Sequence, residues 1–278
     1  MKLTDIFAMC GGLALFLYGM TMMSNGLELA AGNKMKSILE KLTTNRFLGV
    51  LVGALITAVI QSSSATTVMV VGFVNAGLMN LTNAVWVIMG ANIGTTITGQ
   101  LIAIDITALA PIIAFVGIAM IVFFKSKKMD AFGTIIGGLG ILFMGMEMMS
   151  NAMVPLRSSP DFIRIVSTFE NPFIGILVGA VFTAIIQSSS ASVGILQALA
   201  KSGVVTLPSA IYVLFGQNIG TCITAVLASI GTGRNAKRTT IIHLSFNIIG
   251  TIIFVTISLL FPFADIVASL TPGNVPAQ

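Results

Sequence analysis

Long apolar runs, separated by short polar stretches, make up almost the whole chain. Runs such as 5–29, 81–104 and 130–153 carry few charges and reach the roughly 20 residues with which an α-helix crosses a hydrocarbon core of about 30 Å. The runs are continuously apolar and do not alternate, which disfavours a β-barrel. The pattern therefore predicts an all-α integral membrane protein.

The apolar pattern repeats at a constant offset of 126 residues. GVLVGALITAVIQSSSATT at 49–67 aligns with GILVGAVFTAIIQSSSASV at 175–193, and GANIGTTITG at 90–99 aligns with GQNIGTCITA at 216–225. Two similar halves that arose by internal duplication are the simplest explanation. We expect a first transmembrane repeat over 1–126, and a second over 127–278 that includes a short C-terminal tail.

Each half has the same order of elements: a helix, a QSSS region, an NIGT region and a plain apolar helix. The expected ranges are 5–29, 46–78, 81–104 and 107–124 in the first half, and 130–153, 172–203, 207–230 and 239–262 in the second. Asp5 near the start, and a first run that continues past Met23, favour a retained helix over a cleaved signal peptide.

The QSSS region differs from the other segments because polar residues divide it into two short apolar arms. The arms 47–60 and 65–76 are each too short to cross a membrane as a helix. Two such arms predict a re-entrant hairpin, which is allowed only where its tip is buried or lines a wet cavity. Three crossings then remain in each half, so the halves would face opposite ways as inverted repeats.

Charge placement agrees with this topology. Along the predicted path, ten basic residues fall on one side and four on the other, so the positive-inside rule makes the first side cytoplasmic and places both termini outside. The ten are Lys34, Lys36, Lys41, Arg46, Lys125, Lys127, Lys128, Arg234, Lys237 and Arg238, and the four are Lys2, Arg157, Arg164 and Lys201.

Composition narrows the function classes. The chain of 278 residues is 56% hydrophobic and only 8% charged, which excludes an ordinary soluble domain. Its net charge of +5 lies in short loops without interleaved aromatic residues, so we expect no nucleic-acid partner. Cys10 and Cys222 both lie in apolar runs and indicate neither a disulfide framework nor a metal site. No catalytic motif is present, and we expect no enzyme.

The two polar motifs are the candidate chemistry. Serine is a good helix N-cap, so the serine triplet is expected to start the second arm and leave free amides at a positive helix end, an anion site. The first arm would end there with free carbonyls, which suit a small cation together with hydroxyl oxygens. The NIGT motif is expected to interrupt its helix with glycines and to expose backbone groups at mid-membrane. Close helix packing by small residues is the structural alternative.

Three further polar residues lie in apolar runs. Glu147 is an intramembrane carboxylate and a functional candidate by default, although its repeat partner is Thr21; a cavity-facing charge or a subunit contact would also explain it. His243 and Asn247 share a helix face at a spacing of four. Packing hydrogen bonds are favoured for this pair over contact with the site.

The paired QSSS and NIGT motifs resemble those of the bacterial branch of the type II sodium/phosphate cotransporter family, over nearly the whole chain. The stretch from Asn235 to Asn247 adds to the resemblance. The chain departs from the family by stopping near Thr271, where bacterial members usually continue with another apolar helix and often a PhoU-type region. We therefore expect a form that lacks this C-terminal region.

The resemblance implies sodium-driven symport of inorganic phosphate in the cell membrane, with sodium as coupling ion and no other cofactor. Partners would be phosphate, sodium and membrane lipid, and a homodimer is compatible with the sequence. Symport of another anion such as a dicarboxylate, or a non-transporting phosphate sensor or adaptor, remain alternatives. The expected substrate and sodium ligands are Gln61, Ser62, Ser63, Ser64, Thr66, Asn92, Thr95, Gln187, Ser188, Ser189, Ser190, Ser192, Asn218 and Thr221, with sodium at Ser64, Asn92, Thr95, Ser190, Asn218 and Thr221.

Overall fold

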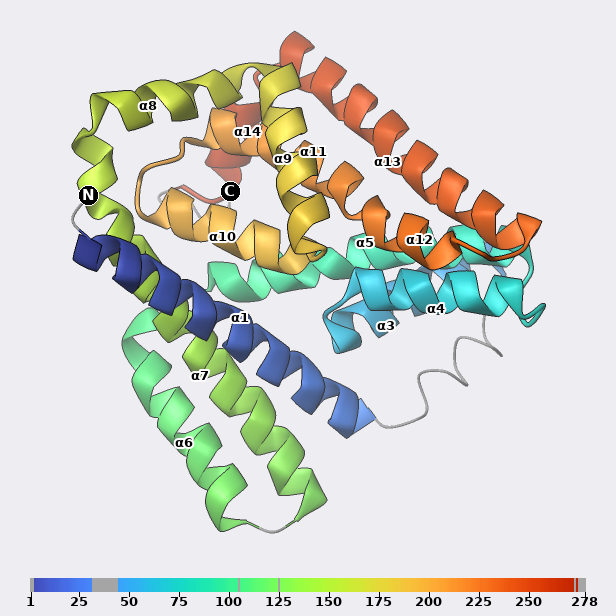
Figure 1. Ribbon diagram of the computed structural model, residues 1–278, viewed down its shortest axis with the longest axis horizontal. Helices are drawn as coiled ribbons and strands as arrows, with labels where there is room; N and C mark the ends of the chain where they lie inside the picture. Colours follow the sequence, from blue (N-terminus) through green and yellow to red (C-terminus); the bar gives the residue numbers. More distant parts are fainter. Residues whose placement is uncertain (1–2, 32–44, 105, 125, 273, 275–278) are drawn as a thin grey trace.

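The computed structural model is helical, and it describes residues 3–31, 45–104, 106–124, 126–272 and 274 (Figure 1). Lys2, Lys34, Lys36, Lys41 and Lys125, which the charge argument uses, lie outside the described residues. The α-helices are α1 (Leu3–Ala31), α3 (Arg46–Ile60), α4 (Ser63–Asn75), α5 (Leu81–Ala103), α6 (Ala110–Phe123), α7 (Lys127–Met153), α8 (Pro160–Ser167), α9 (Pro172–Ile186), α10 (Ser189–Lys201), α11 (Leu207–Gly220), α12 (Cys222–Ser229), α13 (Arg234–Leu260) and α14 (Phe263–Leu270). Short 3-10 turns cover Thr107–Leu109, Val154–Ser158 and Thr168–Glu170.

Five segments of the described chain are long and apolar enough to cross a membrane, which confirms an all-α, multi-pass membrane protein. They are Leu3–Ala30, Leu81–Ala103, Lys127–Leu156, Leu207–Ser229 and Arg234–Leu260. Five of the six expected crossings are therefore present with the required length. The sixth, Thr107–Phe123, belongs to the shorter apolar helices. Pro111 lies in its first turn, where proline is tolerated.

Helices α1 and α7 run antiparallel and in close contact (Figure 1). Glycines make the approach possible, because a methyl group on Gly19 would meet the backbone of Gly138 and Leu142, and one on Gly145 would meet that of Gly12 and Phe16. The pairs Gly12–Gly145 and Gly19–Gly138 exchange places under the offset of 126. This helix pair is therefore built from repeat-related residues in reciprocal contact.

Each QSSS region forms two short helices joined at the polar motif, as predicted. The first consists of α3 and α4 and the second of α9 and α10, and every one of these four helices begins and ends at positions that correspond at the offset of 126. Figure 1 shows α3 and α4 side by side and places the tips of both helix pairs near the middle of the molecule. The sequence did not predict the bend just before α9, where Pro160–Glu170 and Pro172–Ile186 meet at an angle of 101°.

The prediction that the NIGT motif interrupts its helix is wrong for the first half, because α5 runs without a break through Gly90 and Gly94. In the second half only Thr221 separates α11 from α12, and its φ of −57° and ψ of −28° are helical. The glycines serve packing. A side chain on Gly90 would overlap the carbonyl oxygen of Val50 in α3, and the small-residue alternative accounts for this.

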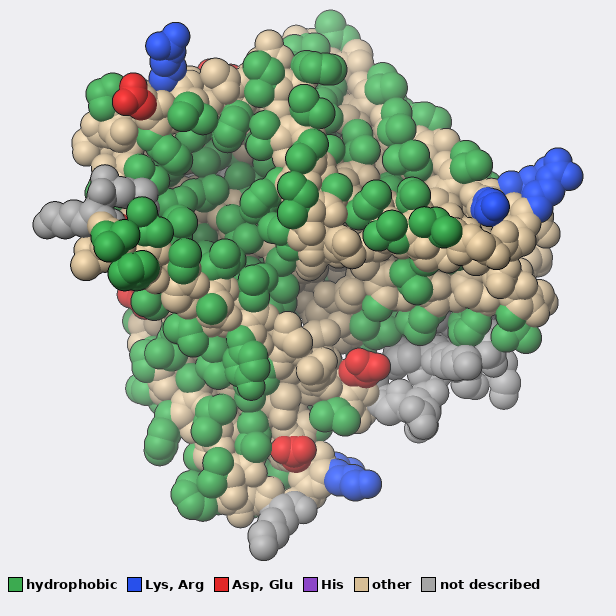
Figure 2. Space-filling model, viewed as in Figure 1, with side chains coloured by type: hydrophobic (Ala, Val, Ile, Leu, Met, Phe, Trp, Pro, Cys, Tyr) green, Lys and Arg blue, Asp and Glu red, His purple; other side chains and the backbone are tan. Residues whose placement is uncertain are grey.

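The surface agrees with a lipid environment. Figure 2 shows hydrophobic side chains over most of one face, while the basic side chains lie near its rim. Large exposed hydrophobic residues lie on several helices; they include Phe115, Phe123, Phe173, Ile185 and Ile252. So many exposed apolar side chains would be a liability in water and are expected in hydrocarbon.

Candidate functional site

The two tips share an unusual backbone conformation. Gln61 and Gln187 have φ angles of 57° and 59°, and they are the non-glycine residues with positive φ among those described. The left-handed region costs an ordinary residue roughly 1–2 kcal/mol, and such residues concentrate at functional sites. Each glutamine ends the first arm of its tip: its N–H bonds to the carbonyl of Thr57 or Thr183.

The first serine of each motif starts the second arm, as expected from its capping preference. The hydroxyl oxygen of Ser62 accepts from the N–H of Ala65 at 3.1 Å, and that of Ser188 accepts from Ala191 at 3.3 Å. These two serines are therefore occupied as N-caps of α4 and α10. The N-terminal amides of both helices and the positive ends of their dipoles lie at the tips.

The two tips contact each other through the remaining serines. The hydroxyl oxygens of Ser63 and Ser189 lie 3.4 Å apart. Ser64 donates to the carbonyl of Gln187 at 3.4 Å, and Ser190 donates to the carbonyl of Gln61 at 3.4 Å. A residue that meets its own repeat partner, flanked by a reciprocal pair of contacts, is the pattern that two-fold symmetry imposes.

Thr66 and Ser192 hold the arms together within each tip. Thr57 donates to the hydroxyl of Thr66 at 2.9 Å, and Thr183 donates to that of Ser192 at 2.8 Å. All four side chains are fully buried. Thr66 and Ser192, which were expected among the ligands, therefore lie inside the tips and bond the two arms to each other.

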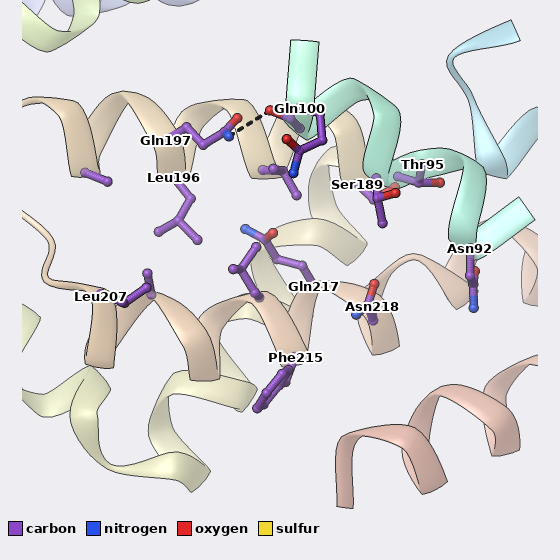
Figure 3. A pocket seen from close by; sticks show the side chains of 16 residues that line it. Asn92, Thr95, Gln100, Ser189, Leu196, Gln197, Leu207, Phe215, Gln217 and Asn218 are labelled. Atoms are coloured by element: carbon purple, nitrogen blue, oxygen red, sulfur yellow. Dashed lines mark hydrogen bonds between the residues drawn. The ribbon is translucent and has the colours of Figure 1, made fainter. Parts of the chain in front are cut away.

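A cavity of about 380 Å³ opens beside the tips, between α5, α10 and α11. Of the expected ligands, Ser189, Asn92, Thr95 and Asn218 line it (Figure 3). Threonine, glutamine and apolar side chains complete the wall, and no Lys, Arg, Asp or Glu among the described residues lines it. The cavity therefore offers neutral hydroxyl and amide groups.

Other expected ligands stay outside the cavity wall. Ser63 and Ser190 are buried at the contact of the tips. Thr221 is 4% exposed and donates to the carbonyl of Gln217 within its own helix at 2.9 Å. Thr95 lines the cavity but also bonds within its helix, to the carbonyl of Ala91 at 3.0 Å.

The two tips are not in equivalent environments. Gln61 is buried, its side-chain oxygen accepts from Thr98 at 2.8 Å, and its side-chain nitrogen donates to the backbone carbonyl of Ala58. Gln187 is exposed. Thr224, which corresponds to Thr98, donates to the carbonyl of Thr221 in its own helix. The same sequence motif therefore has a buried glutamine in the first half and an exposed glutamine in the second.

Residues outside the motifs complete the site. Thr98 bonds Gln61, and Gln197 donates to the carbonyl of Gly99 at 3.0 Å across the cavity wall (Figure 3). Gln217 is 2% exposed, and its side-chain oxygen has no hydrogen-bond partner among the described residues. A sequence signal existed for Gln217, because its repeat partner is Ala91. A buried polar residue in place of alanine marks a difference between the halves.

The three polar residues outside the motifs lie in different environments. Glu147 is exposed and lines a second cavity of about 400 Å³ with Ser150 and Lys201, away from the tips. His243 is 1% exposed, and neither ring nitrogen has a partner in the described part of the chain. Asn247 makes hydrogen bonds between helices, in line with the packing interpretation, and its partners lie in both NIGT segments.

Comparison with known proteins places these features in a family. The family model described as Na+/Pi-cotransporter matches residues 15–151 and 158–270. "Uncharacterized protein YqeW" of Bacillus subtilis (strain 168) is 34% identical over 272 residues, which are 95% of this chain and 84% of that protein. No solved structure matches the chain significantly.

Two relatives carry functional names. "Putative inorganic phosphate export protein YjbB" of Escherichia coli (strain K12) is 26% identical over 256 residues, or 92% of this chain and 46% of that protein, so the chain spans about half of its length. "Sodium-dependent phosphate transport protein 2A" of Rattus norvegicus is 35% identical over 105 residues, which are 37% of this chain and 16% of that protein.

Proposed function

The chain belongs to the Na+/Pi-cotransporter family, and on that premise we propose that it moves inorganic phosphate across the membrane by sodium-coupled symport with alternating access. The observation that carries the proposal is the meeting of the two serine tips, at Ser63 and Ser189, beside a cavity that neutral hydroxyl, amide and apolar groups line and that no charged side chain of the described residues lines. The family is one of transporters and not of enzymes.

Neutral walls favour coupling to a cation. An anion that leaves water without a counter-charge loses several kcal/mol of solvation, and no basic side chain among the described residues lines the cavity to compensate it. Sodium ions that enter with phosphate would supply that charge and release the anion when they leave. A fixed arginine or lysine would instead hold phosphate on both sides of the membrane.

The proposed ligands divide between the two ions. Serine hydroxyls and the N-terminal amides of α4 and α10 suit phosphate oxygens. Oxygen atoms at Ser64, Asn92, Thr95, Ser190, Asn218 and Thr221 are the proposed sodium ligands. Gln217 also lines the cavity, and its buried side-chain oxygen, which has no partner among the described residues, supports a cation or a hydrogen-bond donor there.

We further propose that 1–126 and 127–278 form inverted repeats, with re-entrant hairpins at the two QSSS tips. The shared helix boundaries and the reciprocal contacts between the tips support this arrangement. In Figure 1, the N-terminal end of α13 lies at the right and the adjacent ends of α6 and α7 lie at the bottom, whereas α8 lies toward the upper left and the α10–α11 connection lies on the left. That separation supports the expected difference in basic charge between the two faces.

The test is phosphate transport by the purified full chain in proteoliposomes. Radiolabelled phosphate should accumulate under an inward sodium gradient and not when choline replaces sodium. Binding of phosphate without sodium-dependent movement in either direction would contradict symport and favour a sensor or adaptor. Competition by a dicarboxylate stronger than that by unlabelled phosphate would favour another anion.

The direction of phosphate transport needs a separate experiment, because the name of YjbB describes export. Vesicles preloaded with labelled phosphate and sodium should release phosphate when external sodium is removed. A symporter carries phosphate outward when the sodium gradient points outward. Release that is indifferent to sodium would favour an uncoupled exporter.

A further inference from the structure

A single side chain of α13 joins the two NIGT segments. Asn247 is 4% exposed. Its amide nitrogen donates to the carbonyl of Asn218 at 2.9 Å and to the sulfur of Cys222 at 3.0 Å, while its oxygen accepts from the amide nitrogen of Asn92 at 2.7 Å. Asn92 and Asn218 are repeat partners at the offset of 126. Asn247 therefore links α5 of the first half to α11 and α12 of the second.

The donors and acceptors in this cluster can be arranged in one way only. The backbone carbonyl of Asn218 can only accept, so the amide nitrogen of Asn247 must face it. The oxygen of Asn247 then faces Asn92, which must present its own amide nitrogen. The carbonyl oxygen of Asn92 is consequently the end of that side chain that remains for another ligand. Asn92 and Asn218 both line the cavity, near Ser189 (Figure 3).

This link has no equivalent in the first half. The residue that corresponds to Asn247 is Ile121 in α6, and α6 packs against α7 (Figure 1). One amide on α13 thus bonds to both NIGT asparagines, to the side chain of Asn92 and to the backbone carbonyl of Asn218. Thr240 and Thr251, on the same buried face of α13, donate to the backbone of Ala225 and Phe215 and keep the helix in register.

We propose that Asn247 is a positioning residue for sodium binding: it holds the Asn92 amide so that the carbonyl oxygen is presented as a cation ligand. This inference rests on the proposed sodium coupling and deepens it. Asn247 does not touch the ion but acts through Asn92, as partners of metal ligands do when they fix the orientation of the ligand.

The experiment measures sodium binding by thermal stabilisation of the purified full chain, with choline chloride keeping the ionic strength constant. A ligand that binds the folded state raises the melting temperature in a concentration-dependent way. Asn247→Ala should raise the sodium concentration for half of the effect by about 10-fold, the lower end for loss of such a partner. Asn247→Ser, which can bond its own helix, replaces it if the alanine variant does not fold.

Thr251→Ala is the matched control. It removes another buried hydrogen bond between α13 and α11 without touching either asparagine. We expect it to lower the melting temperature while leaving the half-effect sodium concentration unchanged.

The double variant Asn92→Ala/Asn247→Ala distinguishes positioning from a general effect. If Asn247 acts through Asn92, its replacement should change nothing further once Asn92 is alanine. An additional shift in that background, or an unchanged sodium dependence in Asn247→Ala, would overturn the inference and leave the proposed symport intact. A wild-type chain that sodium does not stabilise would instead contradict the sodium coupling itself.

Discussion

The serines of the two tips have different structural roles, although the two motifs have the same sequence. Ser62 and Ser188 cap helices, Ser63 lies buried against Ser189, and Ser189 reaches the cavity wall. A hydroxyl that donates to a charged ligand contributes about 1.5–3 kcal/mol to its binding. A hydroxyl that caps a helix is not available for such a bond. Ser189 is therefore the most informative serine to replace.

Ser189→Ala should raise the phosphate concentration for half-maximal sodium-dependent uptake by about 10-fold, from the loss of one hydrogen bond to an anion. Ser258→Ala is the control, because the Ser258 hydroxyl bonds to the carbonyl of Phe254 within α13, away from the tips. Uptake assays over a range of phosphate concentrations compare the two variants. Equal half-saturation values would remove Ser189 from the site.

His243 is buried, and its ring nitrogens have no hydrogen-bond partner among the residues that the structure describes. Replacing an unpaired buried polar group by an apolar one of similar size is neutral or stabilising, by about 1–3 kcal/mol. His243→Leu should therefore keep or raise the melting temperature of the purified protein and retain uptake. A clear drop in melting temperature would mean that the imidazole has a partner in the functional state.

At the scale of helices, glycine contacts set how closely the arms approach their neighbours. Gly90 packs on α3 near Val50, and its repeat partner Gly216 packs on α9 near Ile176. Gly216→Ala should sharply reduce the yield of folded protein, because a methyl group would overlap the Ile176 carbonyl.

Gly250→Ala in α13 is the control for that substitution, since nothing lies within 4 Å of the added methyl. It should stabilise the helix by about 0.5–1 kcal/mol. Size-exclusion profiles and melting temperatures measure both variants. If Gly216→Ala proved as well folded as Gly250→Ala, the close contact would not be essential.

The role of these glycines could not be predicted from the sequence alone. The short arms and their polar ends could be predicted because length limits and capping are local rules. A glycine in a membrane helix, however, is equally compatible with an unwound backbone and with close packing. The choice depends on the neighbouring helix, which Gly90 cannot reveal by itself. The contact of Thr98 with Gln61 likewise depends on how α5 lies against the tip.

Across the whole molecule, the difference between Gln61 and Gln187 is the observation that most directly supports the proposed alternating access. Two tips of nearly identical sequence should have matching surroundings, yet Thr98 bonds one glutamine and Thr224 leaves the other exposed. Inverted repeats can exchange such environments when the transporter turns from one side to the other. We expect Gln187 to become buried when Gln61 becomes exposed.

Cysteine labelling tests this exchange. Gln61→Cys and Gln187→Cys, each placed in a Cys10→Ala/Cys222→Ser background, should react with a thiol reagent at rates that change in opposite directions when sodium and phosphate are added. The physical reason is that one conformational equilibrium buries one tip as it frees the other. Slowing of both reactions together would indicate simple protection by bound ligand and contradict the exchange. Opposite changes would establish that the two halves alternate between the environments of Gln61 and Gln187.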